Sequence, residues 1–386
     1  MTFETDPPDT SSEATPNVGD LAAALKDAGV QADASEVLSR LRGVAATPDN
    51  FDRETQRSLI VPSGNDQLSA FLDAQTTELA QCYDRMIRPG DRETTKVRLA
   101  TLRGELAARG LTGFLIPRFD EHLGEYVARH SQRLAWLTGF TGSAGTAVVL
   151  RDKAALFVDG RYTVQAPAET ADDLYRPLNS SDTPPSKWLK QVLGADDRIG
   201  YDPWLHTPDA VKSLREAADH AGAELVPVET NPVDTVWTDR PPPPLGPVIV
   251  HPDAVSGETS SSKRTRIADQ ILKDGADAAI LTAPDSIAWL LNIRGGDLPH
   301  TPVALGFAIL HTNATVDLFM NRRKFADGVA EHLGNQVRAR DPGELATVLD
   351  DLGKAKKTVR LDPAGSVAWF LDRLEAAGAT LARAAD

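Results

Sequence analysis

The sequence predicts an α/β protein with two similar domains, each a mixed β-sheet flanked by helices, that follow a short, mostly helical N-terminal extension. Two observations carry this prediction. Strand-like apolar runs alternate with helix-like segments over most of the 386 residues, which is the pattern of sheets covered by helices. The order helix, strand, Ala-Trp-Leu and hairpin also occurs twice, around residues 134–137 and 287–290. A recurring order of elements indicates repeated units.

The N-terminal extension is assigned to residues 1–90. Residues 1–19 are rich in proline, threonine, serine and acidic residues, so they are expected to be disordered. Helix-spaced apolar residues then predict two helical segments, at 21–44 and 68–86. Pro89 and Gly90 mark the end of the extension. Its function stays open, because it is either a small helical addition or the product of an upstream start or a fusion.

The first domain is assigned to residues 91–245. An amphipathic pattern predicts a helix over 93–109, which Gly110 ends. Residues 113–117 are a buried strand, and the strands 146–150 and 154–158 form a hairpin around the turn Arg-Asp-Lys. Further helices and strands are expected at 187–193, 198–201, 208–221 and 224–226. The run of four prolines at 241–244 is a stiff linker to the next domain.

The second domain is assigned to residues 246–386 and repeats the first. Helices are expected at 264–273, 344–352 and 366–377, and strands at 278–282, 303–310, 315–319 and 358–361. Asp285 and Ser286 are interpreted as the N-cap of the helix ahead of Ile287. Trp136 and Trp289 hold equivalent apolar positions and are expected in the two cores. The repeated order indicates two copies of one module, although unrelated α/β domains can share such an order.

Composition excludes several classes of partner. The formal net charge is -14, which disfavours binding to nucleic acid or to an anionic membrane surface. No apolar run approaches the roughly 18 residues of a spanning helix, and the N-terminus lacks the pattern of a secretory signal. The single cysteine, Cys82, is expected to be an inert packing residue. One cysteine allows no internal disulfide and fits a reducing cytoplasm.

Three long stretches carry a family resemblance. Residues 139–149 (GFTGSAGTAVV) and 156–166 (LFVDGRYTVQA) closely resemble the N-terminal domain of three-domain Xaa-Pro aminopeptidases, also called aminopeptidase P. Residues 233–244 and 285–307 resemble the following part of the same family. The resemblance spans roughly residues 91–386, and matches in the correct order are more specific than one short motif. It implies two creatinase-N-terminal-like domains.

The resemblance also implies a reaction and a metal site. The family removes the N-terminal residue that precedes a proline, using two divalent metal ions, usually manganese, held by Asp, Asp, His, Glu and Glu. Those ligands lie in a third, C-terminal domain of pita-bread fold, which should begin near the end of this chain. His122 and His130, close to Glu121 and Glu125, lack the repeated spacing of metal ligands. We therefore expect no catalytic residue, no bound metal and no peptidase activity from this chain alone.

Four residues are candidates for the substrate site. The resemblance implies that Arg161, the arginine of the DGRY motif, contributes to substrate binding. An arginine at the end of a strand can bind a carboxylate or donate to a carbonyl. Spacing alone favours a pair of Arg161 with Asp159 or Asp152 that stabilises the turn, whereas the resemblance favours the substrate role. Arg294, Asp297 and His300 resemble the family's stretch near the rim of the active site, where a structural role stays open.

These observations lead to one function and two alternatives. The chain is interpreted as the N-terminal portion of a cytoplasmic, homodimeric, metal-dependent Xaa-Pro aminopeptidase, in which it shapes substrate access and dimerisation. Its substrates would be peptides with proline at the second position. One alternative is a non-catalytic protein of the same ancestry that forms dimers or binds a partner. The other is a prolidase-like or creatinase-like hydrolase, which the duplicated domains disfavour.

Overall fold

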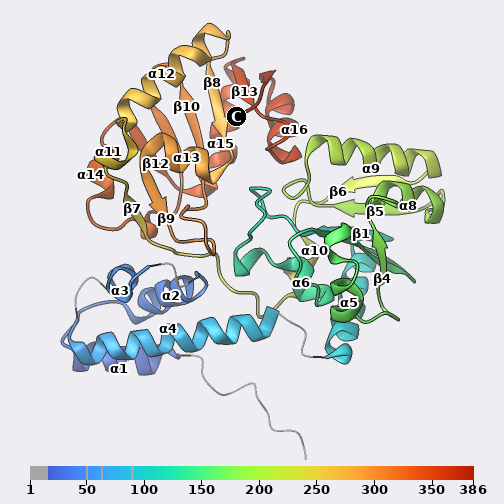
Figure 1. Ribbon diagram of the computed structural model, residues 1–386, viewed down its shortest axis with the longest axis horizontal. Coiled ribbons are helices and arrows are strands. Elements are labelled where there is room, and N and C mark those ends of the chain that lie inside the picture. The colour runs from blue at the N-terminus through green and yellow to red at the C-terminus, as the bar shows by residue number, and fades with distance from the viewer. Residues whose placement is uncertain (1–15, 49–50, 62–63, 88–90) are drawn as a thin grey trace, which may run out of the picture.

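The computed structural model describes residues 16–48, 51–61, 64–87 and 91–386. Within these residues the chain forms a helical N-terminal unit and two six-stranded sheets, each with helices on its faces (Figure 1). The boundary expected at Pro89 and Gly90 and most of the segment expected to be disordered lie outside the described residues. The expectation of disorder is wrong for residues 17–19. The Asn17 side chain accepts a hydrogen bond from Asp20 N and caps a helix that begins at Val18.

The N-terminal unit is a set of four helices: α1 (Val18–Asp27), α2 (Ala34–Ala45), α3 (Arg53–Ile60) and α4 (Asp66–Ile87). The helical segment expected at 21–44 is two helices. Gly29 takes a left-handed backbone conformation with φ of 68° after α1, and the Asp33 side chain caps α2 by accepting from Ser35 N and Glu36 N. The helices share a core that includes Leu21, Leu41 and Leu79.

The first domain contains a six-stranded mixed sheet with the strand order β4-β3-β2-β1-β5-β6. Its strands are β1 (Gly113–Pro117), β2 (Gly145–Leu150), β3 (Ala154–Val158), β4 (Arg176–Asn179), β5 (Arg198–Tyr201) and β6 (Glu224–Pro227). Its helices are α5 (Arg92–Ala108), α6 (Arg133–Thr138), α7 (Gln165–Glu169), α8 (Pro185–Val192), α9 (Pro208–Ala221) and α10 (Pro232–Val236). The predicted hairpin is present, because β2 and β3 pair antiparallel with Thr146 opposite Phe157.

The second domain contains a sheet with the order β12-β11-β10-β8-β13-β14. Its strands are β8 (Ala278–Leu281), β10 (Phe307–His311), β11 (Val316–Phe319), β12 (Val337–Arg340), β13 (Thr358–Leu361) and β14 (Thr380–Arg383), beside a small pair of β7 (Val248–Val250) and β9 (Ile293–Gly295). Its helices are α11 (Asp253–Ser256), α12 (Ser260–Lys273), α13 (Pro284–Leu291), α14 (Val329–Leu333), α15 (Leu345–Lys354) and α16 (Ala368–Ala377).

The two sheets have the same topology. In each, the first strand pairs antiparallel with the second and parallel with the fifth, and the third pairs antiparallel with the second and parallel with the fourth. The fifth and sixth strands pair parallel in both. This shared order confirms the predicted α/β fold with two similar domains.

Three details of the second domain differ from the expectation. The strand expected from residue 303 begins at Phe307. Asp285 and Ser286 are not the N-cap of α13, because the helix begins at Pro284, whose fixed φ suits the first helical position. Trp289 is 44% exposed and lies beneath the Lys263 ammonium at 4.6 Å from the ring centre, whereas Trp136 is buried as expected.

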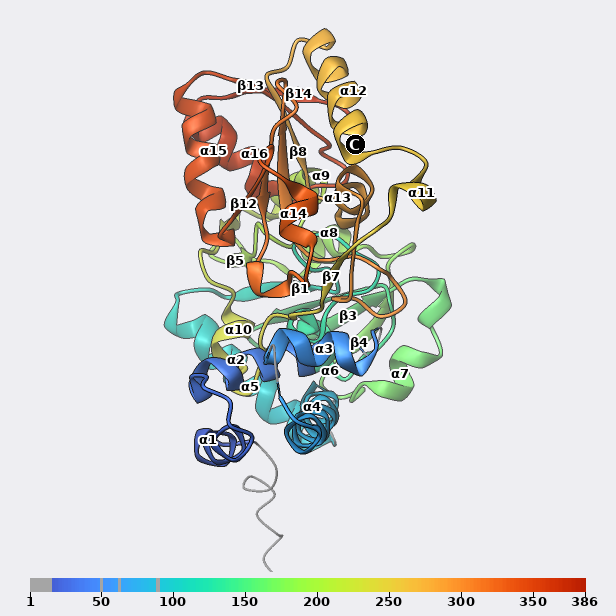
Figure 2. The same cartoon turned by 90° about the vertical axis from the view of Figure 1, so that its left-hand side faces the viewer.

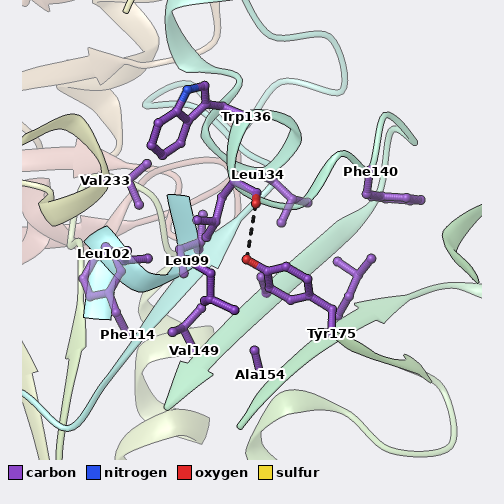
Figure 3. Close-up of a cluster of buried hydrophobic side chains, with 14 of the residues drawn as sticks. Leu99, Leu102, Phe114, Leu134, Trp136, Phe140, Val149, Ala154, Tyr175 and Val233 are labelled. Carbon is purple, nitrogen blue, oxygen red and sulfur yellow. Dashed lines mark hydrogen bonds between the residues drawn. The ribbon is translucent and has the colours of Figure 1, made fainter. Parts of the chain in front are cut away.

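The core of the first domain has two parts, one between its sheet and α5, α6 and α10 (Figure 3) and one between the sheet and α8 and α9. Leu99 and Leu102 of α5 pack against Phe114 of β1. The hydroxyl of Tyr175 donates to the carbonyl oxygen of Leu137 at 3.2 Å, so the one polar group of this buried side chain has a partner. Such packing holds the loop after α6, and the loop is where the candidate site begins.

The two domains contact each other through aromatic side chains. The Trp204 ring, in the loop after β5, stacks on the Trp369 ring of α16 with 3.9 Å between ring centroids. Two backbone hydrogen bonds cross the same contact, from Ala368 N to His206 O at 2.8 Å and from Trp369 N to Pro203 O at 3.1 Å. Loop and helix are therefore held together by both side chains and backbone.

Candidate functional site

The turn that follows β3 presents Arg161 to solvent. The Asp159 side chain accepts a hydrogen bond from Arg161 N at 2.9 Å and caps the short 3-10 helix Gly160–Tyr162. The guanidinium folds back on the same carboxylate, with Nη2 at 2.7 Å from Oδ2, and the Arg161 side chain stays 61% exposed. The hydrogen bond to Asp159 raises the pKa of Arg161, which therefore keeps its charge throughout the physiological pH range.

A chain of hydrogen bonds connects this turn to two neighbouring loops. The Tyr162 hydroxyl lies 2.8 Å from Ser143 Oγ, and Ser143 Oγ donates to Glu125 Oε1 at 3.3 Å. The Tyr162 ring meets Phe140 edge to face, with ring centres 5.5 Å apart. A Cβ on Gly142 would lie 2.3 Å from Phe140 Cζ, so only glycine fits between these aromatic rings. The three loops thus form one connected surface.

A cavity of about 170 Å³ lies next to this surface, between the two domains. Its walls come from residues 120–126 of the first domain and from the helix start and loop at 284–303 of the second. The lining residues are Asp120, His122, Gly124, Glu125, Tyr126, Pro284, Asp285, Leu298, Thr301 and Val303. Glu125 belongs to both the cavity and the hydrogen-bond chain, so the Arg161 turn and the cavity are parts of one region.

The floor of the cavity contains a buried carboxylate. Asp120 is 1% exposed, and its Oδ1 accepts from His122 N at 3.0 Å and from Gly124 N at 3.2 Å. Its Oδ2 has no hydrogen-bond partner among the described residues, and burial raises the pKa of Asp120. His122 donates from Nδ1 to the carbonyl oxygen of Thr282 at 3.0 Å and stacks on Phe307. This histidine therefore joins the two domains.

A buried ionic cluster fixes the loop that carries these residues. Arg133 donates to Asp234 Oδ1 from Nε at 2.7 Å and to Glu121 Oε1 from Nη2 at 3.0 Å, with its side chain only 4% exposed. Arg240 Nη1 lies 2.6 Å from Asp234 Oδ2. Although burial opposes ionisation of Glu121, the charge of Arg133 lowers its pKa to about 2. Position 121 is thereby anchored directly beside Asp120.

Two of the other sequence candidates, Arg294 and Asp297, lie in less open positions. Arg294 donates from Nη1 to the carbonyl oxygens of Ala288 and Ile293. Asp297 is fully buried and accepts from Lys324 Nζ at 2.6 Å, Gly246 N at 2.9 Å and Leu305 N at 2.7 Å. These contacts are what a structural carboxylate makes.

His300 takes a positive φ of 57° in a tight turn, where Leu298 bridges Thr301. Its side chain is exposed, and Leu298 and Thr301 line the cavity. The loops that carry Arg161 and His300 are therefore each connected to the lining of this cavity, through Glu125 and through Leu298 and Thr301. Sequence reasoning missed Ser143 and the Arg133 cluster, because the fold brings their partners together from distant segments. It also missed Asp120, whose hydrogen bonds are local but whose burial depends on the fold.

The described residues provide no metal site. The ring of His122 bonds to Thr282, and His130 Nδ1 lies 2.6 Å from the carbonyl oxygen of Pro241. Across the ranges that the structure describes, no group of three or more histidine, cysteine, aspartate or glutamate side chains could hold a metal ion. In the same ranges, none of the helices has the length and apolar character needed to cross a membrane.

Comparison with known families decides the classification. Residues 98–236 match the family model of the creatinase/prolidase N-terminal domain, and residues 239–385 match a second model with the same description. The chain belongs to the creatinase/prolidase N-terminal domain family. It carries two of these domains in succession, as the two sheets of equal topology indicate.

Similar proteins are Xaa-Pro aminopeptidases. The chain is 32% identical to Xaa-Pro aminopeptidase 2 of Homo sapiens over 276 residues, which cover 71% of this chain and 40% of that protein. It is 36% identical to aminopeptidase P2 of Arabidopsis thaliana over 259 residues, which cover 66% of this chain and 36% of that protein. The resemblance seen in the sequence is thus confirmed, over well under half the length of these relatives.

A solved structure gives the same result. The X-prolyl aminopeptidase of Caenorhabditis elegans, described as a cytosolic enzyme with a di-nuclear active site, superposes with a TM-score of 0.69 at 29% sequence identity. The match covers 75% of this chain and 50% of that enzyme.

Proposed function

We propose that this chain is the substrate-binding, non-catalytic part of a metal-dependent Xaa-Pro aminopeptidase, and that Arg161 binds the peptide. The observation that carries the proposal is the exposed guanidinium of Arg161 beside an interdomain cavity, in a chain whose relatives are Xaa-Pro aminopeptidases. A peptide that offers a carboxylate or a carbonyl would displace the half-buried Asp159 carboxylate and accept from both guanidinium nitrogens.

In this proposal the substrates are peptides with proline at the second position, and the hydrolytic step takes place elsewhere. The described residues do not fit a metal pair. We propose that a domain other than the two described here holds the two divalent ions, which we propose to be manganese, and we attribute no step of the reaction to this chain. We further propose a cytoplasmic homodimer, with domain boundaries near residues 90 and 245.

The test is binding without cleavage. The purified chain is mixed with an Xaa-Pro-Pro peptide and Mn²⁺, and peptide binding is followed by calorimetry while release of the N-terminal residue is followed by mass spectrometry. We expect a binding isotherm and no released amino acid. Metal-stimulated release would contradict the proposed division of labour, and absence of binding at millimolar peptide would contradict the substrate-binding role. Sedimentation velocity of the same sample tests the homodimer.

A further inference from the structure

The N-terminal helices α1–α4 lie outside both family matches, which begin at residue 98, and their position suggests a function of their own. Figure 1 shows α2 and α3 beneath the small β7–β9 pair of the second domain, while α4 extends toward α6 of the first. Figure 2 shows the same helices at one end of the molecule in a view turned by 90°. The unit therefore reaches both domains and the linker that joins them.

The linker is held in the core of the helical unit. Leu245 follows the proline run, is 3% exposed and packs in the same apolar cluster as Leu41 and Val44. Its backbone N donates to the carbonyl oxygen of Gly43 at 3.0 Å. A Cβ on Gly43 would lie 2.4 Å from Leu245 Cδ1, so the helix approaches the linker as closely as glycine permits.

A second set of contacts joins the unit to the first domain. Arg129 donates to both carboxylate oxygens of Asp84, at 2.7 and 3.0 Å, and to the carbonyl oxygen of Thr47 at 2.7 Å. Arg98 of α5 donates to the carbonyl oxygen of Met86 at 2.8 Å, at the end of α4. Ile87, the last residue of α4, is buried in the core of the first domain.

A third set joins the unit to the second domain. Arg323 donates from Nη1 to Ser39 Oγ at 3.1 Å, and the same nitrogen lies 3.6 Å from Glu36 Oε1. The Phe51 ring covers Gly296, where a Cβ would lie 2.7 Å from Phe51 Cδ2. Gly296 precedes the buried Asp297, which also accepts from Gly246 N of the linker. Contacts to linker and second domain therefore meet at one place.

We propose that residues 16–87 act as a brace, which fixes the orientation of the second domain relative to the first. The brace is needed because the candidate cavity has walls from both domains, so a change in their orientation changes its width. Among the described residues, direct contacts between the domains include an aromatic cluster, a small apolar cluster in which Ala128 packs with Ala288, Leu298 and Val303, the packing of Ala368 against α9, and a few hydrogen bonds. Interfaces of that kind normally permit relative motion of the domains.

The test measures the spread of interdomain distances by double electron–electron resonance in the full chain. Spin labels are attached at Lys212→Cys of α9 and Glu331→Cys of α14, both exposed, in a Cys82→Ser background. Leu245→Ala removes the apolar side chain held by α2, and Arg323→Ala removes the contacts to Ser39 and Glu36. The matched controls are Leu272→Ala and Arg338→Ala, which replace exposed residues of the second domain.

We expect a broader or shifted distance distribution for Leu245→Ala and Arg323→Ala, and the parental distribution for both controls. Parental distributions for both brace variants, with folding verified by circular dichroism, would overturn the proposal. If Leu245→Ala does not fold, Phe51→Ala takes its place, because it removes the ring that covers Gly296 and belongs to none of the buried apolar clusters. The measurement needs no peptide and no metal, so it is independent of the proposed function.

Discussion

His206 is held uncharged inside the interface between the domains. Its side chain is buried, Nδ1 donates to the carbonyl oxygen of Asp202 at 3.0 Å, and Nε2 has no hydrogen-bond partner among the described residues. Burial lowers the pKa of His206 to about 4. The unfolded chain, where the imidazole titrates near pH 6.5, therefore binds this proton first as the pH falls.

We predict that acid weakens the fold partly through this residue. The pKa of His206 is lower in the folded than in the unfolded chain. Its contribution to the free energy of unfolding is therefore fully present above about pH 6.5 and is lost as the pH falls toward 4. His206→Asn retains a donor at the position of Nδ1 and does not titrate. In urea unfolding between pH 7.5 and 4.5, the free energy of unfolding of the variant should fall less than that of the parent. The difference should be on the order of 1–3 kcal/mol. Identical slopes would contradict the assignment.

At Gly142, in the candidate site, we predict that a larger side chain destabilises the fold by steric conflict. Gly142→Ala would place its Cβ against Phe140 and Tyr162, and forcing the two aromatic rings apart should lower the free energy of unfolding by about 1–3 kcal/mol. The control is Gly160→Ala in the neighbouring turn, where an added Cβ meets no atom within 4 Å. Urea titrations of both variants compare them directly, and equal midpoints would show that the loop accommodates the methyl group.

The sequence predicted the contacts of a residue well where its partners lie nearby in the chain. The sequence allowed Arg161 to pair with its own turn, and the structure has that pair with Asp159, while the substrate role of Arg161 stays a prediction. The burial of Asp297 could not be predicted, because its partners Gly246 and Lys324 come from distant segments. The expectation that Trp289 is a core residue was wrong. The equivalent position of the repeated motif is buried in the first domain, as Trp136, but faces solvent in the second.

At the scale of elements, the ionic cluster holds α6 and α10 together. Arg133→Met would leave the Glu121 carboxylate without its buried partner and Asp234 with Arg240 alone, and we expect a loss of roughly 3–5 kcal/mol in the free energy of unfolding. Arg92→Met is the control, because its pair with Asp173 is exposed and should contribute little. Thermal and urea unfolding of the two variants measure the difference. A similar small loss in both would contradict the argument.

The long helices and most central strands followed from the sequence, including the four-residue strands β5 and β13, whereas some edge and N-terminal elements did not. The hairpin of β2 and β3 and the helices α4, α5, α9 and α12 were predicted because their apolar patterns are long and their ends carry glycine or a cap. The edge strand β4 and the helix α3 were missed. Each has eight residues or fewer, and such short elements form because neighbouring strands and helices pair with them.

At the scale of the whole molecule, the repeated topology was predictable but the contact between the repeats was not. Trp204→Ala would remove the ring that stacks on Trp369. We predict faster hydrogen exchange at the amides of Ala368 and Trp369, which donate across the interface. Trp289→Ala is the control, because that exposed tryptophan belongs to the second domain alone. Unchanged protection in Trp204→Ala would show that the backbone bonds hold the interface without the stacked rings.

The central claim is that the Arg161 turn binds peptide. The most direct test follows the side-chain Nε–H resonance of Arg161 during titration with an Xaa-Pro-Pro peptide. Peptide affinity is measured for the parent, for Arg161→Gln and for the control Arg176→Gln. Arg176 is exposed and lies at the end of β4 that is far from this turn. We predict that the Arg161 resonance shifts on titration, that Arg161→Gln weakens binding at least tenfold, or about 1.4 kcal/mol, and that Arg176→Gln binds as the parent does. An unshifted resonance and equal affinity in all three proteins would contradict the claim.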